Sequence, residues 1–173
     1  MPPHEPNPMD VTPEAARTLY EQGWNYHHGE GVPQDYPLAL RLYQRAADGG
    51  DVKAMFAVGW MHENGLGTFQ DLKEAIAWYR KAAELGNARA MCSLGWMYLK
   101  GLGVAQDYKM AREWFGYAAN AGSADAMYNL GAMLAKGLDG IKDKEAALKW
   151  YRKAAGMGVA RAAEAIRRIE QRG

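Results

Sequence analysis

The chain has 173 residues, of which 49% are apolar and 24% are charged, and these values are typical of a soluble globular protein rather than of a disordered one. Lysine and arginine number 21 against 20 aspartate and glutamate residues, which gives a net charge of +1. This balance excludes a global field that would attract the chain to nucleic acid or to an anionic membrane, so recognition by charge must be local.

The first predicted helix begins at Thr12-Pro13-Glu14 and continues to about His28. Threonine can cap a helix, proline suits its first position, and glutamate favours its positive end. Residues 1–11, which precede this helix, hold four of the seven prolines and no periodic apolar pattern. They are predicted to form a disordered, proline-rich leader, and residues 12–173 to form a single repeat domain.

From Ala15 onward the sequence repeats every 36 residues without an insertion or deletion. Glycine and aspartate recur in register at Gly23, Gly59, Gly95 and Gly131, at Gly50, Gly86, Gly122 and Gly158, and at Asp35, Asp71, Asp107 and Asp143. The four repeats span residues 15–50, 51–86, 87–122 and 123–158. A repeat of this length predicts a solenoid or an array.

Each repeat contains two helical patterns with a glycine-rich break between them. The first helix is predicted to begin after a capping Asp51, Asn87 or Ser123 and to end near Gly65, Gly101 or Gly137. The break reads GEGVPQD, GLGTFQD and GLGVAQD in repeats 1 to 3 and GLDGIKD in repeat 4. The aspartate that ends each break is predicted to cap the second helix, and Asp71 with Glu74 forms a capping-box pattern.

The repeated glycine inside each first helix predicts a close helix contact. Gly95 lies mid-helix, where glycine costs about 1 kcal/mol relative to alanine, so its recurrence indicates that another helix passes too near for a side chain. The facing small surface is expected from Ala111, Ala118 and Ala119, and the space between the helices is expected to be filled by Trp114, Phe115, Leu94 and Met97. For the second-helix tryptophans Trp78, Trp114 and Trp150 we expect a place in the core.

A capping helix is predicted after the last repeat, over residues 159–171. Its apolar face comprises Ala162, Ala165, Ile166 and Ile169. Stacking of helical repeats leaves a terminal face that such a helix can cover. Arg167 and Arg168 lie on the other side, where they form either a solvated face or a basic functional patch.

The apolar runs, the N-terminus and the single cysteine bear on the compartment and redox state of the protein. No apolar run approaches the roughly 20 residues needed to cross a bilayer, and the N-terminus lacks the basic and apolar regions of a secretory signal. Cys92 is the only cysteine, which excludes an intrachain disulfide and a multi-cysteine metal site. A cytoplasmic location is the simplest interpretation, and an exported protein whose signal peptide had been removed would show the same features.

Residues 90–122 read A-x-x-x-L-G-x-M-Y-x-x-G-x-G-V-x-Q-D-Y-x-x-A-x-x-W-F-x-x-A-A-x-x-G, and this pattern resembles the Sel-1-like repeat. The resemblance covers residues 15–158 in four consecutive copies. It implies an all-α fold, a right-handed α/α superhelix or solenoid of four helix-turn-helix repeats, related to the tetratricopeptide repeat, with first helices on the concave face. Members of this family commonly act as adaptors that hold macromolecular complexes together.

Two departures from the family pattern limit what carries over. Repeat 4 has Asp139 in place of the second loop glycine and Lys142 in place of the glutamine of the other repeats, so a rearranged loop is expected there. Cysteine-rich bacterial members join each helical pair by a disulfide, which this chain cannot form. The export and envelope functions of that branch therefore carry over weakly.

If the first helices line a groove, its residues share one helical face at the spacing i, i+4, i+7. The predicted partner-binding residues are Tyr20, Trp24, His27, Lys53, Phe56, Trp60, Glu63, Arg89, Cys92, Trp96, Leu99, Lys100 and Tyr128. An aromatic floor with basic edges predicts a protein or peptide partner with apolar anchors and acidic flanks. Two interpretations stay open for Trp24, Trp60 and Trp96, which either bind that partner or pack between neighbouring first helices.

The main function hypothesis is a non-catalytic scaffold or adaptor, and the alternative is a structural or regulatory subunit that uses its convex face or its loops. Ser93 and Ser123 do not begin a Ser-x-x-Lys motif, and no glycine-rich phosphate loop is present. We therefore predict no catalytic residue, no cofactor and no metal site; His27 and His28 are adjacent and diverge on a helix. Stacking of RNA bases on the repeated tryptophans is the remaining alternative, but the balanced charge argues against a nucleic-acid partner.

Overall fold

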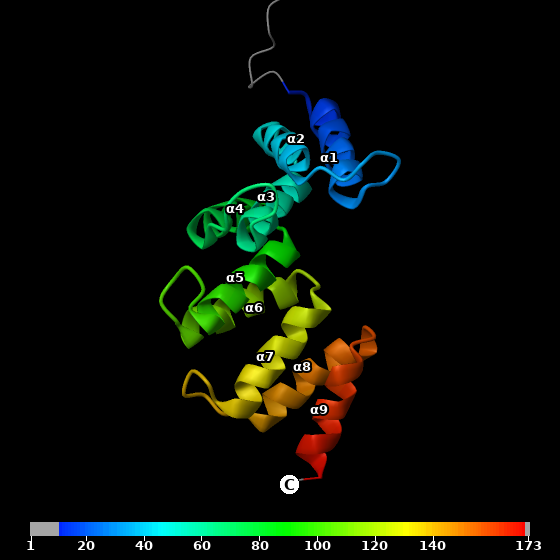
Figure 1. Cartoon of the computed structure of the whole chain (residues 1–173). Helices are drawn as coiled ribbons and strands as arrows, with labels where there is room; N and C mark the ends of the chain where they lie inside the picture. The colour runs from blue at the N-terminus through cyan, green and yellow to red at the C-terminus, as the bar shows by residue number, and fades with distance from the viewer. Residues whose placement is uncertain (1–10, 172–173) are drawn as a thin grey trace, which may run out of the picture. The chain divides into compact units, whose positions relative to one another are not determined.

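The computed structural model describes residues 11–171, and within that range the chain is helical with no strand (Figure 1). The helices are α1 Pro13–His28, α2 Tyr36–Asp48, α3 Val52–Asn64, α4 Leu72–Glu84, α5 Ala88–Lys100, α6 Tyr108–Asn120, α7 Ala124–Lys136, α8 Lys144–Gly156 and α9 Ala160–Glu170. The predicted all-α fold of four helix pairs and a final helix is confirmed. Apart from residue 11, the predicted leader lies outside the described residues.

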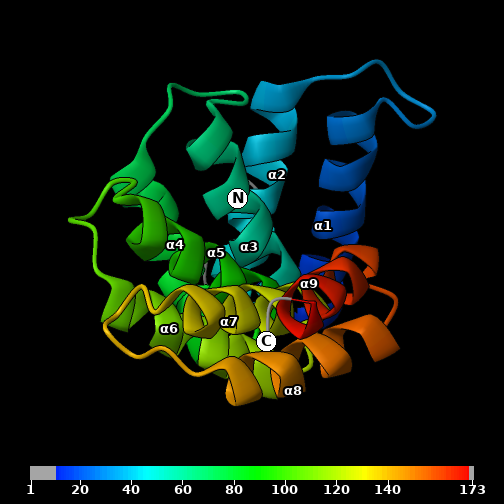
Figure 2. The same cartoon turned by 90° about the horizontal axis from the view of Figure 1, so that it is seen from below.

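The helices belong to two compact units. Unit 1 reaches to Asn87 and contains α1–α4, and unit 2 starts at Ala88 and contains α5–α9. Within each unit every helix packs against the next one in the chain, and Figure 2 shows the pairs α1 with α2 and α7 with α8 from below. Unit 1 therefore holds repeats 1 and 2, and unit 2 holds repeats 3 and 4 with α9.

Side-chain caps and glycines set the ends of the first helices, as predicted. Thr12, Asp51 and Ser123 accept backbone N–H bonds at the starts of α1, α3 and α7, at 3.2, 2.8 and 3.2 Å. The four first helices end at glycines with φ between 66° and 73°, a left-handed conformation that glycine adopts without strain: Gly29, Gly65, Gly101 and Gly137.

The aspartates before the second helices are N-caps, but the capping-box prediction is only half correct. Asp71 accepts bonds from the backbone N–H groups of Lys73 and Glu74, both at 3.0 Å. The Asp71 N–H donates to the carbonyl of His62 at 2.9 Å and not to Glu74. Glu74 instead accepts a bond from Nε1 of Trp78 at 2.8 Å, because the (i, i+4) spacing places that indole within reach.

A repeated glutamine closes the loop of the first three repeats. Nε2 of Gln34, Gln70 and Gln106 donates to a carbonyl in the last turn of the preceding first helix, at 2.7, 2.8 and 2.8 Å. Repeat 4 has Lys142 at this position, and its loop is rearranged as expected. Its second left-handed glycine is Gly140, three residues after Gly137, whereas the corresponding glycines of the other repeats are two residues apart.

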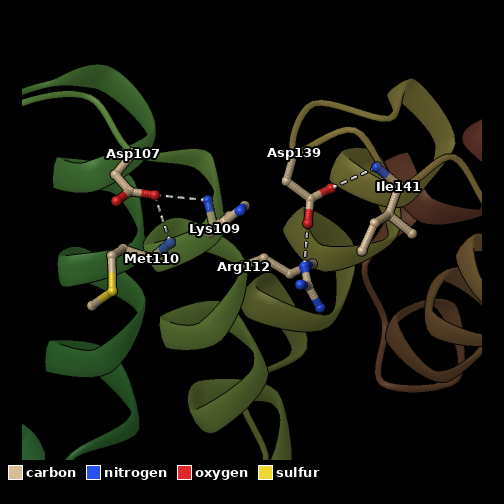
Figure 3. Close-up of polar contacts among 6 residues, drawn as sticks. All are labelled: Asp107, Lys109, Met110, Arg112, Asp139 and Ile141. Carbon is tan, nitrogen blue, oxygen red and sulfur yellow. Dashed lines mark hydrogen bonds and ion pairs between the residues drawn. The ribbon is translucent and has the colours of Figure 1, made fainter.

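Asp139 holds the rearranged loop of repeat 4 against α6 (Figure 3). Its side chain is fully buried, and it forms an ion pair with Arg112, whose side chain is 35% exposed. The same carboxylate accepts the N–H of Ile141 at 3.3 Å. Where the other repeats have a left-handed glycine, repeat 4 therefore has a buried carboxylate that binds the loop to α6.

The close contact at the mid-helix glycines is confirmed, but the nearest group is an aromatic ring. A Cβ added at Gly95 would lie 2.6 Å from Cδ1 of Phe115, and the same pairing occurs at Gly23 with Tyr43, at Gly59 with Tyr79 and at Gly131 with Tyr151. The expectation that Ala111, Ala118 and Ala119 face the glycine was therefore incomplete. These alanines are buried, which lets the paired helix approach closely enough for its ring to cover the glycine.

The second-helix tryptophans are half-buried, not fully enclosed. Trp78 packs against the core of unit 1 and Trp150 against that of unit 2. The expected contact with the core is therefore confirmed for these two tryptophans. Lys81 Nζ lies 4.0 Å from the ring centre of Trp78. The fully buried aromatic residue is the next one in sequence, such as Tyr79 or Phe115.

Helix α9 covers the end of unit 2, as the sequence predicted. Ala162 is fully buried, and Ala165, Ile166 and Ile169 pack against the same core. Arg168 is exposed and lies 3.8 Å from Glu164. This arrangement is a solvated outer face on a capping helix.

Candidate functional site

The first helices of both units expose one indole each at the same repeat position, except in repeat 4. Trp24, Trp60 and Trp96 are 42%, 37% and 39% exposed. Large apolar side chains are usually buried, so a recurring exposed indole marks a surface able to contact another molecule. In repeat 4 this position is Ala132.

In unit 1 the two indoles are joined by two imidazole rings into a cluster of Trp24, His28, His27 and Trp60, which we call the ring cluster. Trp24 stacks on His28 with 3.8 Å between ring centres. His27 lies 4.6 Å from His28 and 5.3 Å from Trp60. Because Trp60 belongs to α3 and the others to α1, the cluster spans the two first helices of this unit.

His27 is the half-buried member of the ring cluster. Its Nδ1 is buried and has no hydrogen-bond partner within residues 11–171. Burial, and secondarily the neighbouring His28, lowers the pKa of His27 below its ordinary value. The ring is thus neutral at pH 7 and acts there as an aromatic surface with one unused nitrogen.

Tyr20, Phe56 and Tyr128 have a structural role as well as a partly accessible surface. Each is half-buried, and its ring centre lies 5.5, 5.5 or 5.4 Å from that of the buried tyrosine in its own repeat. Repeat 3 has Cys92 at this position, and there the rings of Phe115 and Trp96 are nearly perpendicular, with 6.0 Å between their centres. These half-buried side chains therefore connect the first-helix surface to the buried tyrosines.

Glu63, predicted to contact a partner, is engaged inside unit 1. Its Oε2 accepts a bond from the hydroxyl of Tyr79 at 2.5 Å. The aligned pair in repeat 3 is Leu99 with Phe115, which lacks the hydroxyl. Sequence reasoning missed the hydrogen bond between Tyr79 and Glu63. The signal for it was that tyrosine and glutamate in repeat 2 are replaced together by phenylalanine and leucine in repeat 3.

The basic residues of the predicted site are exposed on both units. Lys53 on α3 and Arg89 on α5 reach solvent. Lys100 Nζ lies 5.7 Å from the ring centre of Trp96, within the range of a cation–π contact. Among these residues, a cation therefore lies beside an exposed indole at Lys100 and Trp96.

Cys92 is a half-buried thiol between α5 and α7. Nδ2 of Asn129 lies 3.9 Å from its sulfur, and Asn129 itself is buried. Burial, and secondarily the charge of Asp125, raises the pKa of Cys92 to about 11. The thiol is therefore protonated at pH 7 and is a poor nucleophile.

Two features of the first-helix surface were missed by sequence reasoning. In unit 2, Arg161 of α9 forms an ion pair with Asp125 of α7 and lies 4.4 Å above the ring of Tyr128. Arg161 falls in the 36-residue register of Asp125, so the sequence contained a signal. In unit 1, a pocket of about 580 Å³ is lined by Pro13, Ala16, Arg17, Tyr20, Glu21, Gly49, Gly50, Asp51, Val52 and Lys53.

No group of three histidine, cysteine, aspartate or glutamate side chains in residues 11–171 is placed to hold a metal ion. None of the helices in that part of the chain is long and apolar enough to span a bilayer.

Comparison with known proteins identifies the repeat. The family model for the Sel1 repeat matches residues 15–51, 52–87, 88–123 and 124–159. No curated protein matches the chain. The register of these matches agrees with the predicted 36-residue units to within one residue.

Solved structures show the same fold. A Sel1 repeat protein from Oxalobacter formigenes is 34% identical with a TM-score of 0.83, over 90% of this chain and 65% of that one. The protective antigen c5321 of uropathogenic Escherichia coli, which displays an SLR fold, is 37% identical with a TM-score of 0.85, over 88% and 33%. The cysteine-rich protein B of Helicobacter pylori is 23% identical with a TM-score of 0.55, over 65% and 87%. The chain thus spans less than two thirds of the length of the first two proteins.

Proposed function

The chain belongs to the Sel1 repeat family, and from this premise we propose that it is a non-catalytic protein-interaction module. The exposed surface of the first helices within a unit binds a peptide segment of a partner protein. The corresponding surfaces lie on α1 and α3 in unit 1 and on α5 and α7 in unit 2, where Ala132 stands in place of one indole.

The observation that carries this proposal is the exposure of Trp24, Trp60 and Trp96. The aromatic residue that packs each helix pair together is buried, with Tyr79 and Phe115 at 0% exposure, whereas these indoles are 37% to 42% exposed. Stability alone does not require an exposed indole at a repeated position. Tryptophan is also enriched at sites that dominate binding energies in protein interfaces.

The chemistry of the surface defines the partner segment. The indoles favour apolar or aromatic anchors, and the exposed cations Arg17, Lys53, Arg89 and Lys100 favour acidic flanks. The neutral thiol of Cys92 offers no nucleophile, since the pKa of about 11 keeps it protonated. Binding without chemistry is the function that this arrangement supports.

A selection experiment tests the proposal. Peptides are selected on the chain from a random library displayed on phage, and their affinities are measured by isothermal titration calorimetry. A Trp24→Ala and Trp60→Ala double variant is expected to weaken binding by about 2–4 kcal/mol, as is common for central aromatic anchors. Tyr117→Ala is the matched control, because Tyr117 is 56% exposed but lies on α6. Equal affinity for the double variant and the parent chain, retained when Trp96→Ala is added, would refute the proposal.

One observation favours a second candidate function, in which the loops make the contact. Phe69, in the loop between α3 and α4, is 94% exposed, and an aromatic side chain at a loop tip is suited to insertion into a pocket on a partner. In that case Phe69→Ser would abolish binding of the selected peptides, and the double tryptophan variant would bind normally.

A further inference from the structure

Unit 2 contains an internal pair that shows what the first-helix surface can hold. Arg161 of α9 lies beside α7, where it forms an ion pair with Asp125 and covers the ring of Tyr128 at 4.4 Å. Arg161 follows Asp125 by one 36-residue repeat. Neighbouring first helices therefore bring these two repeat positions together, with a tyrosine beneath them.

Unit 1 has the same three positions with a different charge pattern. Arg17 corresponds to Asp125, Lys53 to Arg161, and Tyr20 to Tyr128. All three of these unit 1 residues line the pocket of about 580 Å³ between α1 and α3. Where unit 2 pairs an anion with a cation, unit 1 thus places two cations around an open pocket.

The two carboxylates that also line the pocket have roles of their own. Asp51 caps α3 by accepting the N–H of Ala54 at 2.8 Å. Glu21 accepts from Nε of Arg17 at 3.1 Å, in an exposed (i, i+4) pair whose side chains are 60% and 78% accessible. Such a pair is weak and easily exchanged. Lys53 forms no ion pair with any of residues 11–171.

We propose that unit 1 has a carboxylate-binding site between Arg17 and Lys53, and that an aspartate or glutamate side chain of the partner segment occupies it. This inference rests on the proposed function and adds a position for the acidic group. The bound carboxylate supplies in unit 1 the anion that Asp125 supplies in unit 2. Tyr20 forms the wall of the site, as Tyr128 does below Arg161.

The distance from this site to the ring cluster defines a spacing in the partner. Trp24 follows Arg17 by seven residues on α1, and Trp60 follows Lys53 by seven on α3, which corresponds to about 10 Å along each helix. An extended peptide covers that length in about three residues. The preferred partner therefore carries an acidic residue three positions from an apolar anchor.

Two capped peptides test the site by NMR on the full chain labelled with nitrogen-15. The probes are acetyl-Leu-Ala-Ala-Glu-amide and acetyl-Leu-Ala-Ala-Gln-amide, which differ only in the charge. The glutamate peptide is expected to shift the Gly50 and Lys53 amides and to bind about threefold to tenfold more tightly at low salt, as for two exposed ion pairs. The preference is expected to vanish in about 1 M sodium chloride, where the Debye length is about 3 Å.

Two charge-reversal variants test the site on the protein, one inside the pocket and one outside it as the matched control. Arg17→Asp recreates in unit 1 the Asp125 and Arg161 arrangement with Lys53, so the glutamate preference is expected to disappear. Arg45→Asp changes the charge equally on α2, outside the pocket lining, and is expected to retain the preference.

The outcomes separate this site from the general proposal. If both peptides shift the Trp24 and Trp60 indole signals equally and leave Gly50 unchanged, the carboxylate site is refuted and the interaction surface stands. A glutamate preference that survives in Arg17→Asp also refutes the site. If neither peptide shifts an indole or an amide of unit 1, both proposals fail.

Discussion

A single methyl group added at Gly95 tests the packing between paired helices. A Cβ at this position would lie 2.6 Å from Cδ1 and 2.7 Å from Cε1 of Phe115, distances that real Cβ atoms do not adopt. Phe115 is fully buried, so its ring cannot rotate away without displacing the surrounding core. Gly95→Ala must therefore separate α5 from α6 or strain the ring.

The size of the effect follows from two opposing contributions. Overpacking of a core by one methyl group destabilises a protein by about 1–3 kcal/mol. Replacing a mid-helix glycine with alanine gains up to about 1 kcal/mol. We therefore expect a net destabilisation of about 1–2 kcal/mol, which lowers Tm by about 2–8 °C for a chain of this size.

Gly116 provides the matched control, because it lies within α6 and a Cβ there would meet nothing within 4 Å. Gly116→Ala is expected to raise Tm by about 2–4 °C, since only the helix preference changes. At Gly131 the nearest ring atom is 3.0 Å away, so its alanine variant is expected to fall between the two. Thermal melts followed by circular dichroism measure all three, and a higher Tm for Gly95→Ala would refute the assigned contact.

Three further predictions concern buried polar groups. The lowered pKa of His27 means that the folded state binds the imidazole proton less readily than the unfolded state does. The stabilisation from neutral His27 is therefore lost as pH falls below about 6.5. Between about pH 7 and pH 5, Tm should decrease less in His27→Gln than in the parent chain, and identical decreases would contradict this. Because the pKa of Cys92 is raised to about 11, iodoacetamide at about pH 8 should alkylate it at least about 100-fold more slowly than a free thiol, and fast labelling measured by mass spectrometry would argue against a buried thiol. Asp139→Ala removes the buried partner of Arg112 and should destabilise unit 2 by about 2 kcal/mol in urea unfolding, whereas an unchanged midpoint would show that the ion pair has no net effect.

The fold was predictable because the sequence repeats its packing rules four times. Glycine at a fixed helical position, aspartate before each second helix and glycine after each first helix all predicted elements that the structure contains. One helix pair alone would have been ambiguous. Agreement among four copies separates residues that the scaffold requires from residues that vary.

The errors arose where one side chain had two available partners. Glu74 fits a capping box, but an indole four residues later competes for its carboxylate. Glu63 occupies a predicted surface position, yet the hydroxyl of Tyr79 lies across the helix pair within 2.5 Å. Such choices depend on the distance between helices, which periodicity does not specify.

The site was only partly predictable for a related reason. Exposure of Trp24, Trp60 and Trp96 depends on how far neighbouring first helices separate, which the sequence period does not specify, so the sequence leaves both interpretations open. The pair of Arg161 with Asp125 lies outside any single repeat and appears only when α9 is aligned with the first helices. Because α9 is half of a further repeat, Asp125 and Arg161 occupy the same repeat positions as Arg17 and Lys53.

The most direct test of the interaction surface is an NMR map of the chain bound to a peptide selected on it. Of the six indole N–H signals, the account predicts that the first-helix indoles of the unit that binds the peptide shift, Trp24 and Trp60 in unit 1 or Trp96 in unit 2, together with amides of the first helices of that unit. The signals of Trp78, Trp114 and Trp150 should not move. Shifts concentrated on the second helices or around Phe69, with the first-helix indoles unchanged, would contradict it.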